Sequence, residues 1–500
     1  MTTASRAARF ALVGQLLWPA AVVRAQSAGD PPRFTAMSMS LDTLIAKLPG
    51  RPVALSSLVR VALREGFAAQ LATADRQSAE GTALYEGRAI DPQLRLITDM
   101  AGASRFGGVA VGLNRETTLA LDGALPWGTV LSADYARVSA RSTAALPGVS
   151  SPTRVSVNVS QPLLDGVNQR TVSWRAAQVE RTAAGHALRR AREEIATDLE
   201  LQYWRLAEAQ AVEAVYGRSL ELAREILSRN TELASRDLIA TVDVLTVRSG
   251  VALRESFYTQ ARQSRYDQSD LLLFAAYGAK AAAMVASDSL PLMAVDSVTP
   301  LDETPALVEA VRRALENRAD LRAARTVREA TRLRAMQSRN AVLPNLSLDG
   351  GWSSAAGGVA TGTQANASGS SWRVGLSMSA PVLNRGDRGL SLVARTQLEI
   401  DSLRVGSREA QITSDVRAAV RAITLGSQRW RSAANAASLA WEQLVAERRR
   451  LELGLGDSFR LLQTEENAVQ AQLEAVRARY DLARASARFR LAIGQVMTAL

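Results

Sequence analysis

The stretch Val155-Ser-Val-Asn-Val-Ser-Gln-Pro162-Leu-Leu-Asp-Gly166 has a counterpart in the second half of the chain, Val374-Gly-Leu-Ser-Met-Ser-Ala-Pro381-Val-Leu-Asn-Arg-Gly386. Apolar residues recur at every second position before each proline, which is typical of a β-strand with one apolar and one polar face. A tract without proline follows each stretch. Each stretch therefore predicts a strand, then a turn at the proline, then a helix.

The distribution of proline predicts how long these helices are. All fifteen prolines lie at or before Pro381, and none lies between Pro162 and Pro291. Proline inside a helix costs about 3 kcal/mol, so the two proline-free tracts, both rich in Ala, Leu, Arg, Glu and Gln, are free to form long helices. A helix over residues 168–232 would be roughly 95 Å long at 1.5 Å per residue, which is longer than a compact domain of this size.

A narrow apolar seam supports helical packing along both tracts. Steps of three and four residues separate its members, as in a coiled coil, and Gln202 and Glu213 interrupt it. Many members are alanine, which allows helices to approach closely on both sides. The seam comprises Ile195, Leu199, Leu206, Ala209, Tyr216, Leu220, Ala223 and Leu227 in the first tract and Leu473, Val476, Tyr480, Ala483, Ala487 and Leu491 in the last.

The two halves of the chain repeat one plan, which is a helix, a β region and then two long helices. Asp91-Pro92-Gln93-Leu94 and Leu343-Pro344-Asn345-Leu346 open the two β regions. Pro344 to Pro381 spans 37 positions, enough for one hairpin, whereas Pro92 to Pro162 spans 70 positions. The first half therefore has room for extra strands or for a longer exposed loop.

The first residues predict export. Arg6 and Arg9 precede a short apolar run, and Val23-Arg24-Ala25 offers small residues at a cleavage site, as in a secretory signal peptide. No later segment has 18 consecutive apolar residues, so we expect no membrane-spanning helix. Strands of about 9–11 alternating residues remain as the way to cross a membrane.

The composition argues against an enzyme and against a nucleic-acid-binding protein. The chain has no cysteine, one histidine (His186, inside a predicted helix) and no metal-ligand or phosphate-loop spacing, so we expect no catalytic residue, cofactor or metal. Its net charge is +11, but the arginines are spread along helices among Glu and Asp. Nucleic-acid binding needs a concentrated basic patch with stacking aromatic residues, which this pattern lacks.

Together these features resemble the TolC-like outer-membrane efflux proteins (outer membrane factors) over roughly residues 41–496. The resemblance implies a mainly α fold with transmembrane β-strands, in which long antiparallel helical hairpins form a periplasmic α-barrel. A β-barrel shared between three subunits, with four strands from each, would continue the α-barrel. The motifs that carry the resemblance are Gln161-Pro-Leu-Leu-Asp-Gly166, Leu343-Pro-Asn-Leu346, Arg450-Leu-Glu-Leu-Gly-Leu-Gly456 and Val242-Asp-Val-Leu245.

The expected domain organisation follows the repeat. A signal peptide (1–25) and an N-terminal extension (26–54) precede the first repeat (55–278), which holds a β region over about 92–162 and a long helical hairpin over about 166–278. A linker or equatorial segment (279–305) joins it to the second repeat (306–496), which holds a β hairpin over about 344–381 and a helical hairpin over about 386–494.

The resemblance also implies the function and the partners. The chain would be a channel subunit in the outer membrane of a Gram-negative bacterium, with helices extending into the periplasm. It would give passive exit to substrates of a tripartite efflux pump or a type I secretion system. The expected partners are two further copies in a homotrimer, a periplasmic adaptor (membrane fusion) protein, an inner-membrane pump or ABC transporter, and outer-membrane lipid, with no nucleic acid and no cofactor.

Candidate functional residues lie at the turns between the long helices, near Leu233–Val244 and Leu453–Leu461. By resemblance, Asp243 matches a carboxylate that forms gating links, although it could equally be an exposed first-turn residue. Arg460 and Gln463 stand where some members carry aspartates, so we expect a less cation-selective entrance. Asp457 or Ser458 can cap the following helix. The gating candidates are Asp243, Asp457, Arg460 and Gln463, and the adaptor-docking candidates are Leu453, Gly454, Leu455, Gly456, Ser458 and Ser235.

Two further interpretations stay open at this stage. Trp127, Trp352 and Trp372 lie in the β regions, where they would form interfacial belts in a barrel or ordinary sheet-face aromatics in a soluble protein. The alternative function is a periplasmic coiled-coil scaffold or adaptor without a pore. That alternative gives no reason for β segments at matching places in both halves.

Overall fold

The computed structural model describes most of the chain between residues 44 and 496. The described residues are 44–102, 113–141, 153–164, 169–287, 290–298, 306–356 and 369–496, apart from Lys47, Leu238 and Gly454. The predicted signal peptide and most of the N-terminal extension lie outside them, as does part of the linker (288–289 and 299–305).

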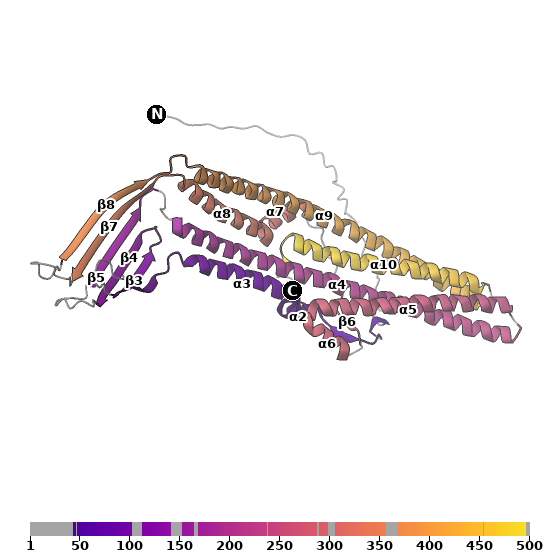
Figure 1. Ribbon diagram of the computed structural model, residues 1–500. Helices are drawn as coiled ribbons and strands as arrows, with labels where there is room; N and C mark the ends of the chain where they lie inside the picture. The colour runs from indigo at the N-terminus through magenta and orange to yellow at the C-terminus, as the bar shows by residue number, and fades with distance from the viewer. Residues whose placement is uncertain are drawn as a thin grey trace, which may run out of the picture.

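The molecule is elongated, with a β-sheet at one end and the turns of two helical hairpins at the other (Figure 1). The predicted long helices are present, and the two longest have 67 and 68 residues, or about 100 Å each at 1.5 Å per residue. The helices are α2 (Leu55–Glu65), α3 (Phe67–Gly87), α4 (Gln169–Ser235), α5 (Thr241–Tyr277), α6 (Ala279–Ser287), α7 (Leu307–Asn317), α8 (Ala319–Asn340), α9 (Arg385–Glu452) and α10 (Ser458–Ala492).

Next to the sheet the helices form a layer. In this layer α3 contacts α4, α4 contacts α8, and α8 contacts α9, while α5 and α10 pack further along against α4 and α9. The alanines Ala223, Ala483 and Ala487 of the predicted seam are almost fully buried, as expected for close helix approach. In the part of the chain that is described, no helix has both the length and the apolar character needed to cross a membrane.

The predicted equatorial segment folds against the middle of α4. Its strand β6 (Leu292–Ala294) pairs in parallel with β1 (Arg51–Val53), which precedes α2. The Tyr203 hydroxyl donates to Asp296 Oδ2 at 2.7 Å and accepts from the backbone N–H groups of Val295 and Asp296 at 3.0 Å each. Burial of this hydroxyl raises the pKa of Tyr203. The contacts fix the segment that joins the two halves onto the helical layer.

The main sheet has six antiparallel strands in the order β2-β3-β4-β5-β7-β8. The resemblance implied four strands per subunit, and this expectation is corrected by the structure: the first β region supplies four strands by itself, because its 70 positions hold two hairpins. The strands are β2 (Gln93–Gly102), β3 (Leu113–Ala124), β4 (Val130–Arg141), β5 (Thr153–Pro162), β7 (Asn345–Ala356) and β8 (Gly369–Ser379).

Strands from the two halves meet at the pair β5–β7, where Val157 lies opposite Trp352. The helices continue into the strands in matching order: α3 leads to β2, β5 leads to α4, α8 leads to β7, and β8 leads to α9. The sheet and the helical layer therefore form one continuous wall, in which β3 and β4 are the only described strands without a helix of their own.

Candidate functional site

The tip of the helical domain is built from two turns that lie together at the end far from the sheet (Figure 1). One turn joins α4 to α5 between Ser235 and Thr241, and the other joins α9 to α10 between Glu452 and Ser458. The carboxylate of Asp457 accepts a hydrogen bond from the backbone N–H of Arg460 at 2.8 Å, which caps α10. Asp457 rather than Ser458 is thus the capping residue among the two that the sequence offered.

A cavity of about 700 Å³ lies between the two turns. Asp243 and Asp457 both line it, together with Asn230, Ser458 and Phe459. The amide of Asn230 donates to the Ser458 hydroxyl at 3.0 Å and so joins α4 to α10 beside the cavity. The tertiary structure therefore brings the first and second turns, more than 200 residues apart, to one hollow.

The gating candidates differ in their surroundings. Arg460 is exposed and forms an ion pair with the buried Glu447, from Nε to Oε1 at 3.3 Å, within the α9–α10 hairpin. Gln463 is exposed one turn further along α10. Asp243 is exposed in the first turn of α5, and within the described residues its carboxylate forms no ion pair.

The docking candidates gather on an apolar tip surface. Leu453 and Leu455 are exposed, whereas Gly454 between them lies outside the described residues. Ser235 donates to the carbonyl of Glu232 at 2.7 Å in its own helix, and Gly456 lies close against Leu451. Further apolar members of this surface were not among the sequence candidates, although apolar residues in the first turns of α5 and α10 were a usable signal. These members are Val242, Leu245 and Phe459.

Two buried ion pairs stiffen the shaft behind the tip. Arg254 of α5 pairs with Glu465 of α10, with Nε at 2.9 Å from Oε2, and Ser219 of α4 donates to the same carboxylate. Further along, Arg265 of α5 pairs with Glu213 of α4, and both side chains are almost completely buried. Glu213 was visible in the sequence as a break in the apolar seam, but its partner was not.

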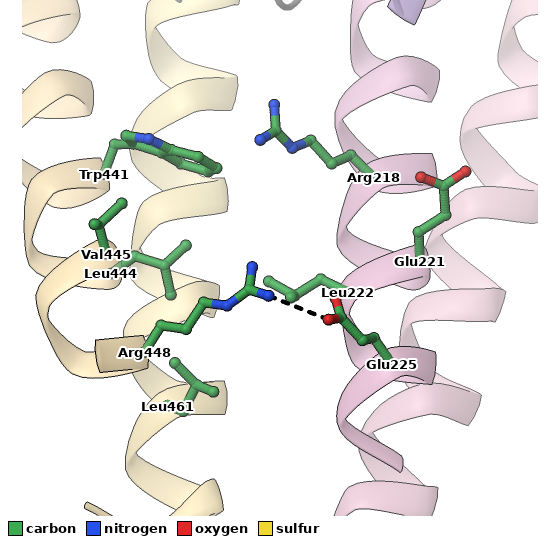
Figure 2. Close-up of a pocket in the computed structure, with 9 residues that line it drawn as sticks. All are labelled: Arg218, Glu221, Leu222, Glu225, Trp441, Leu444, Val445, Arg448 and Leu461. Carbon is green, nitrogen blue, oxygen red and sulfur yellow. Dashed lines mark hydrogen bonds and ion pairs between the residues drawn. The ribbon is translucent and has the colours of Figure 1, made fainter. Parts of the chain in front are cut away.

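A groove between α4 and α9 lies on the shaft near the tip (Figure 2). The guanidinium of Arg218 lies 4.5 Å from the ring centroid of Trp441, and Arg448 forms an ion pair with Glu225 at 3.1 Å. Leu222, Leu444 and Leu461 supply apolar lining, and the hollow has about 290 Å³. These contacts join the helical hairpins of the two halves.

The sheet at the opposite end has one apolar and one polar face. Residues directly opposite in an antiparallel pair point to the same face, so the register assigns each side chain to a face. The polar face carries ion pairs and hydrogen bonds, such as Arg95–Asp122 and the Ser160 hydroxyl donating to Asp349 at 2.6 Å. The apolar face carries sixteen exposed large apolar side chains: Leu94, Leu96, Met100, Leu119, Leu121, Leu131, Tyr135, Val155, Val157, Val159, Leu348, Trp352, Trp372, Val374, Leu376 and Met378.

The tryptophans predicted in the β regions lie at two levels of the sheet. Trp352 and Trp372 are direct partners on β7 and β8, seven residues from the helix-side ends of their strands. Trp127 is exposed in the tight turn between β3 and β4, at the helix-side end of the sheet.

Comparison with known proteins gives the family. Residues 310–495 match the family model described as outer membrane efflux protein. This part of the chain, rather more than a third of it, is similar to the outer membrane efflux protein family. The TolC-like recognition made from the sequence is thereby confirmed. No curated protein sequence matches the chain.

Solved structures show the same fold over most of the chain. The outer membrane channel CmeC of Campylobacter jejuni matches with a TM-score of 0.65 and 15% identity, over 88% of this chain and 85% of that chain. The outer membrane protein VceC of Vibrio cholerae gives 0.63 and 18%, over 88% and 96%. The open state of the outer membrane channel MtrE of Neisseria gonorrhoeae gives 0.62 and 16%, over 88% and 88%. At these identities the likeness concerns the fold.

Proposed function

We propose that this chain is a channel subunit of the outer membrane of a Gram-negative bacterium. It gives passive exit to substrates of a tripartite efflux pump or a type I secretion system, and it needs no catalytic residue for that task. The observation that carries the proposal is the continuous apolar face of the six-stranded sheet. Its sixteen large apolar side chains are each 38–78% exposed and lie side by side on one face. A soluble monomer rarely exposes a continuous apolar patch larger than roughly a few hundred Å².

A lipid environment accounts for both faces of the sheet. Strands of 10–12 residues, tilted, match the length needed to cross the hydrocarbon core. The apolar face then contacts lipid, and the Ser-, Asp- and Arg-rich face lines a watery lumen. In this arrangement Trp127 on one side and Trp352 with Trp372 on the other are suited to the two interfacial belts.

Oligomerisation follows from the open edges of the sheet. β2 and β8 leave backbone N–H and C=O groups unpaired, and such groups cost several kcal/mol each in lipid. Closure of the sheet into a barrel with further copies of the same chain removes both edges. The family resemblance suggests three copies, a homotrimer. The helices would then continue the β-barrel as a tunnel into the periplasm.

The tip is the proposed site of gating and docking. Leu453, Leu455 and Phe459 present apolar side chains for a periplasmic adaptor, which would connect the channel to an inner-membrane pump or ABC transporter. Asp243, Asp457, Arg460 and Gln463 would set the charge at the entrance. The ion pair with Glu447 partly neutralises the positive charge of Arg460. We therefore expect the entrance to show only a weak preference between anions and cations.

The alternative, a periplasmic scaffold without a pore, accounts for the helices but not for the sheet. A soluble scaffold would expose the apolar face and both edges of the sheet to water, which invites aggregation. The sheet of the described residues is therefore accounted for better by a channel than by a scaffold.

Heat-modifiability and crosslinking of the tagged protein in purified outer membranes test the proposal. We expect a detergent-extracted species that crosslinks to three times the monomer mass and unfolds to the monomer on boiling. A protein recovered from the periplasm without detergent would refute the channel and favour the scaffold.

A further inference from the structure

Among the residues that the structure describes, the first half of the chain has one more β-hairpin than the second half. In the second half a single hairpin, β7–β8, lies between α8 and α9, whereas four strands lie between α3 and α4. β2 follows α3 and β5 precedes α4, so the additional pair is β3–β4, Leu113–Arg141. We propose that this β3–β4 hairpin is a membrane-embedded part of the channel wall, so that three subunits close a barrel of eighteen strands. The inference rests on the proposed function and on six strands from each of three copies.

The added hairpin continues both faces of the sheet. Leu119 and Leu121 of β3 lie in register with Tyr135 and Ala133 of β4, on the same face as Leu96 and Leu94 of β2. The neighbouring side chains of Thr118, Asp122 and Ser132 point to the polar face. A hairpin folded away from the membrane would have no reason to keep the two-residue alternation in step with β2 and β5.

The turn of the hairpin is anchored to the helices. The buried Thr171 hydroxyl of α4 donates to the carbonyl of Pro126 at 2.9 Å, and Thr129 bonds to Gln161 of β5. The hairpin is therefore held at the level where the other strands meet the helical layer, and it extends from there in the same direction as β5 (Figure 1).

The register gives the tilt of the strands. Gln93, at the helix-side end of β2, is level with Arg373 through five successive strand pairs. Ser379, at the helix-side end of β8, lies six residues beyond Arg373. The offset along the strands is six residues at about 3.3 Å each, and the distance across the strands is five spacings of about 4.8 Å each. Their ratio corresponds to a strand tilt of about 40°, within the range of closed barrels.

The width of the sheet matches the width of the helical layer only with the added hairpin. Six strands spaced about 4.8 Å apart and tilted by about 40° cover about 38 Å of perimeter, whereas four would cover about 25 Å. The four helices next to the sheet, α3, α4, α8 and α9, cover about 38 Å at an interaxial distance of about 9.5 Å. The wall thus keeps its circumference where helices give way to strands.

A second copy of the chain fits the free edges. β2 runs away from the helices and β8 runs back toward them, so β8 of one copy and β2 of the next are antiparallel, like every pair inside the sheet. Three copies give eighteen strands and a perimeter about 1.5 times that of a twelve-stranded barrel at the same tilt. Such a barrel has room for a water-filled lumen of porin width.

Single cysteines in this cysteine-free chain test the inference. Leu119→Cys and Thr118→Cys probe the two faces of β3, and Leu376→Cys and Gly375→Cys probe the two faces of β8 as matched controls. A Cβ at Gly375 meets open space, so that variant should fold normally. The purified trimer is placed in lipid nanodiscs and treated with a charged, membrane-impermeant thiol reagent.

We expect Thr118→Cys and Gly375→Cys to react at least about tenfold faster than Leu119→Cys and Leu376→Cys, because only the polar face meets water. A bimane label at Leu119→Cys should also be quenched by lipids brominated in their tails. If Leu119→Cys reacts as fast as Thr118→Cys while the β8 pair keeps its contrast, the hairpin lies outside the wall and the inference is overturned. If both pairs lose the contrast, the proposed channel itself fails.

Strand counting by electron cryomicroscopy of the same nanodiscs is the second measurement. Eighteen strands with β3 and β4 in the wall support the inference. A closed wall of twelve strands, with the hairpin folded into the lumen or above the membrane, would contradict it even if the protein is a trimeric channel.

Discussion

Substitution of Glu213 by glutamine tests whether the buried ion pair with Arg265 holds α4 and α5 together. The side chains are 1% and 0% exposed, so solvent does not screen the pair. Glutamine removes the negative charge that compensates the buried guanidinium, whose Nη1 still donates to the Pro49 carbonyl at 2.9 Å. Breaking one partner of such a pair costs about 3–5 kcal/mol, and the retained carbonyl favours the lower end of that range.

An exposed pair between the same two helices is the matched control. Arg224 and Glu255 also join α4 to α5, but their side chains are 55% and 59% exposed. Glu255→Gln should therefore cost less than about 1 kcal/mol. The double variant Glu213→Leu with Arg265→Met removes both buried charges and should return to within about 2 kcal/mol of the parent protein.

The measurement is urea denaturation of the detergent-solubilised protein, followed by the helical circular-dichroism signal. A stabilising role of the buried pair is refuted if Glu213→Gln lowers the free energy of unfolding no more than Glu255→Gln does. This role is also refuted if the double variant is as unstable as Glu213→Gln.

Four further predictions follow from the same structure. Asp457→Ala removes the cap of α10 and should cost about 0.5–2 kcal/mol, seen as faster hydrogen exchange in the first turn of α10, whereas Asp457→Ser should retain protection. Burial raises the pKa of the Glu193 carboxyl above its ordinary 4.5, so the folded protein binds this proton more tightly than the unfolded chain does. The folded protein therefore loses stability as pH rises from 4.5 to the folded pKa. Glu193→Gln should raise the melting temperature at pH 7.5 and raise it less at pH 5. Val159→Arg, on the apolar face between the levels of Trp127 and Trp352, should cost about 2–4 kcal/mol and reduce the yield of heat-modifiable trimer, while Ser156→Arg on the polar face should not. Arg460→Glu should shift the reversal potential in a KCl gradient toward cation selectivity, and an unchanged potential would remove Arg460 from the entrance.

Local patterns in the sequence determined the long helices and the tip. Proline can neither donate a backbone hydrogen bond nor fit a helix interior, so its absence after Pro162 and after Pro381 was enough to predict α4 and α9. The cap at Asp457 is likewise local, since it involves residues three positions apart. The alternation in β5 and β8 correctly indicated strands with two different faces.

Only the tertiary structure decided what depends on residues far apart in the chain. The pairing of β5 with β7 joins residues about 195 positions apart, and the partner of Glu213 lies on another helix. The number of strands is of this kind as well: alternation was present in Leu113–Arg141, but a strand acquires a place in a sheet only through its neighbours. Periodicity is set within a few residues, whereas register, edges and buried ion pairs arise when distant faces meet.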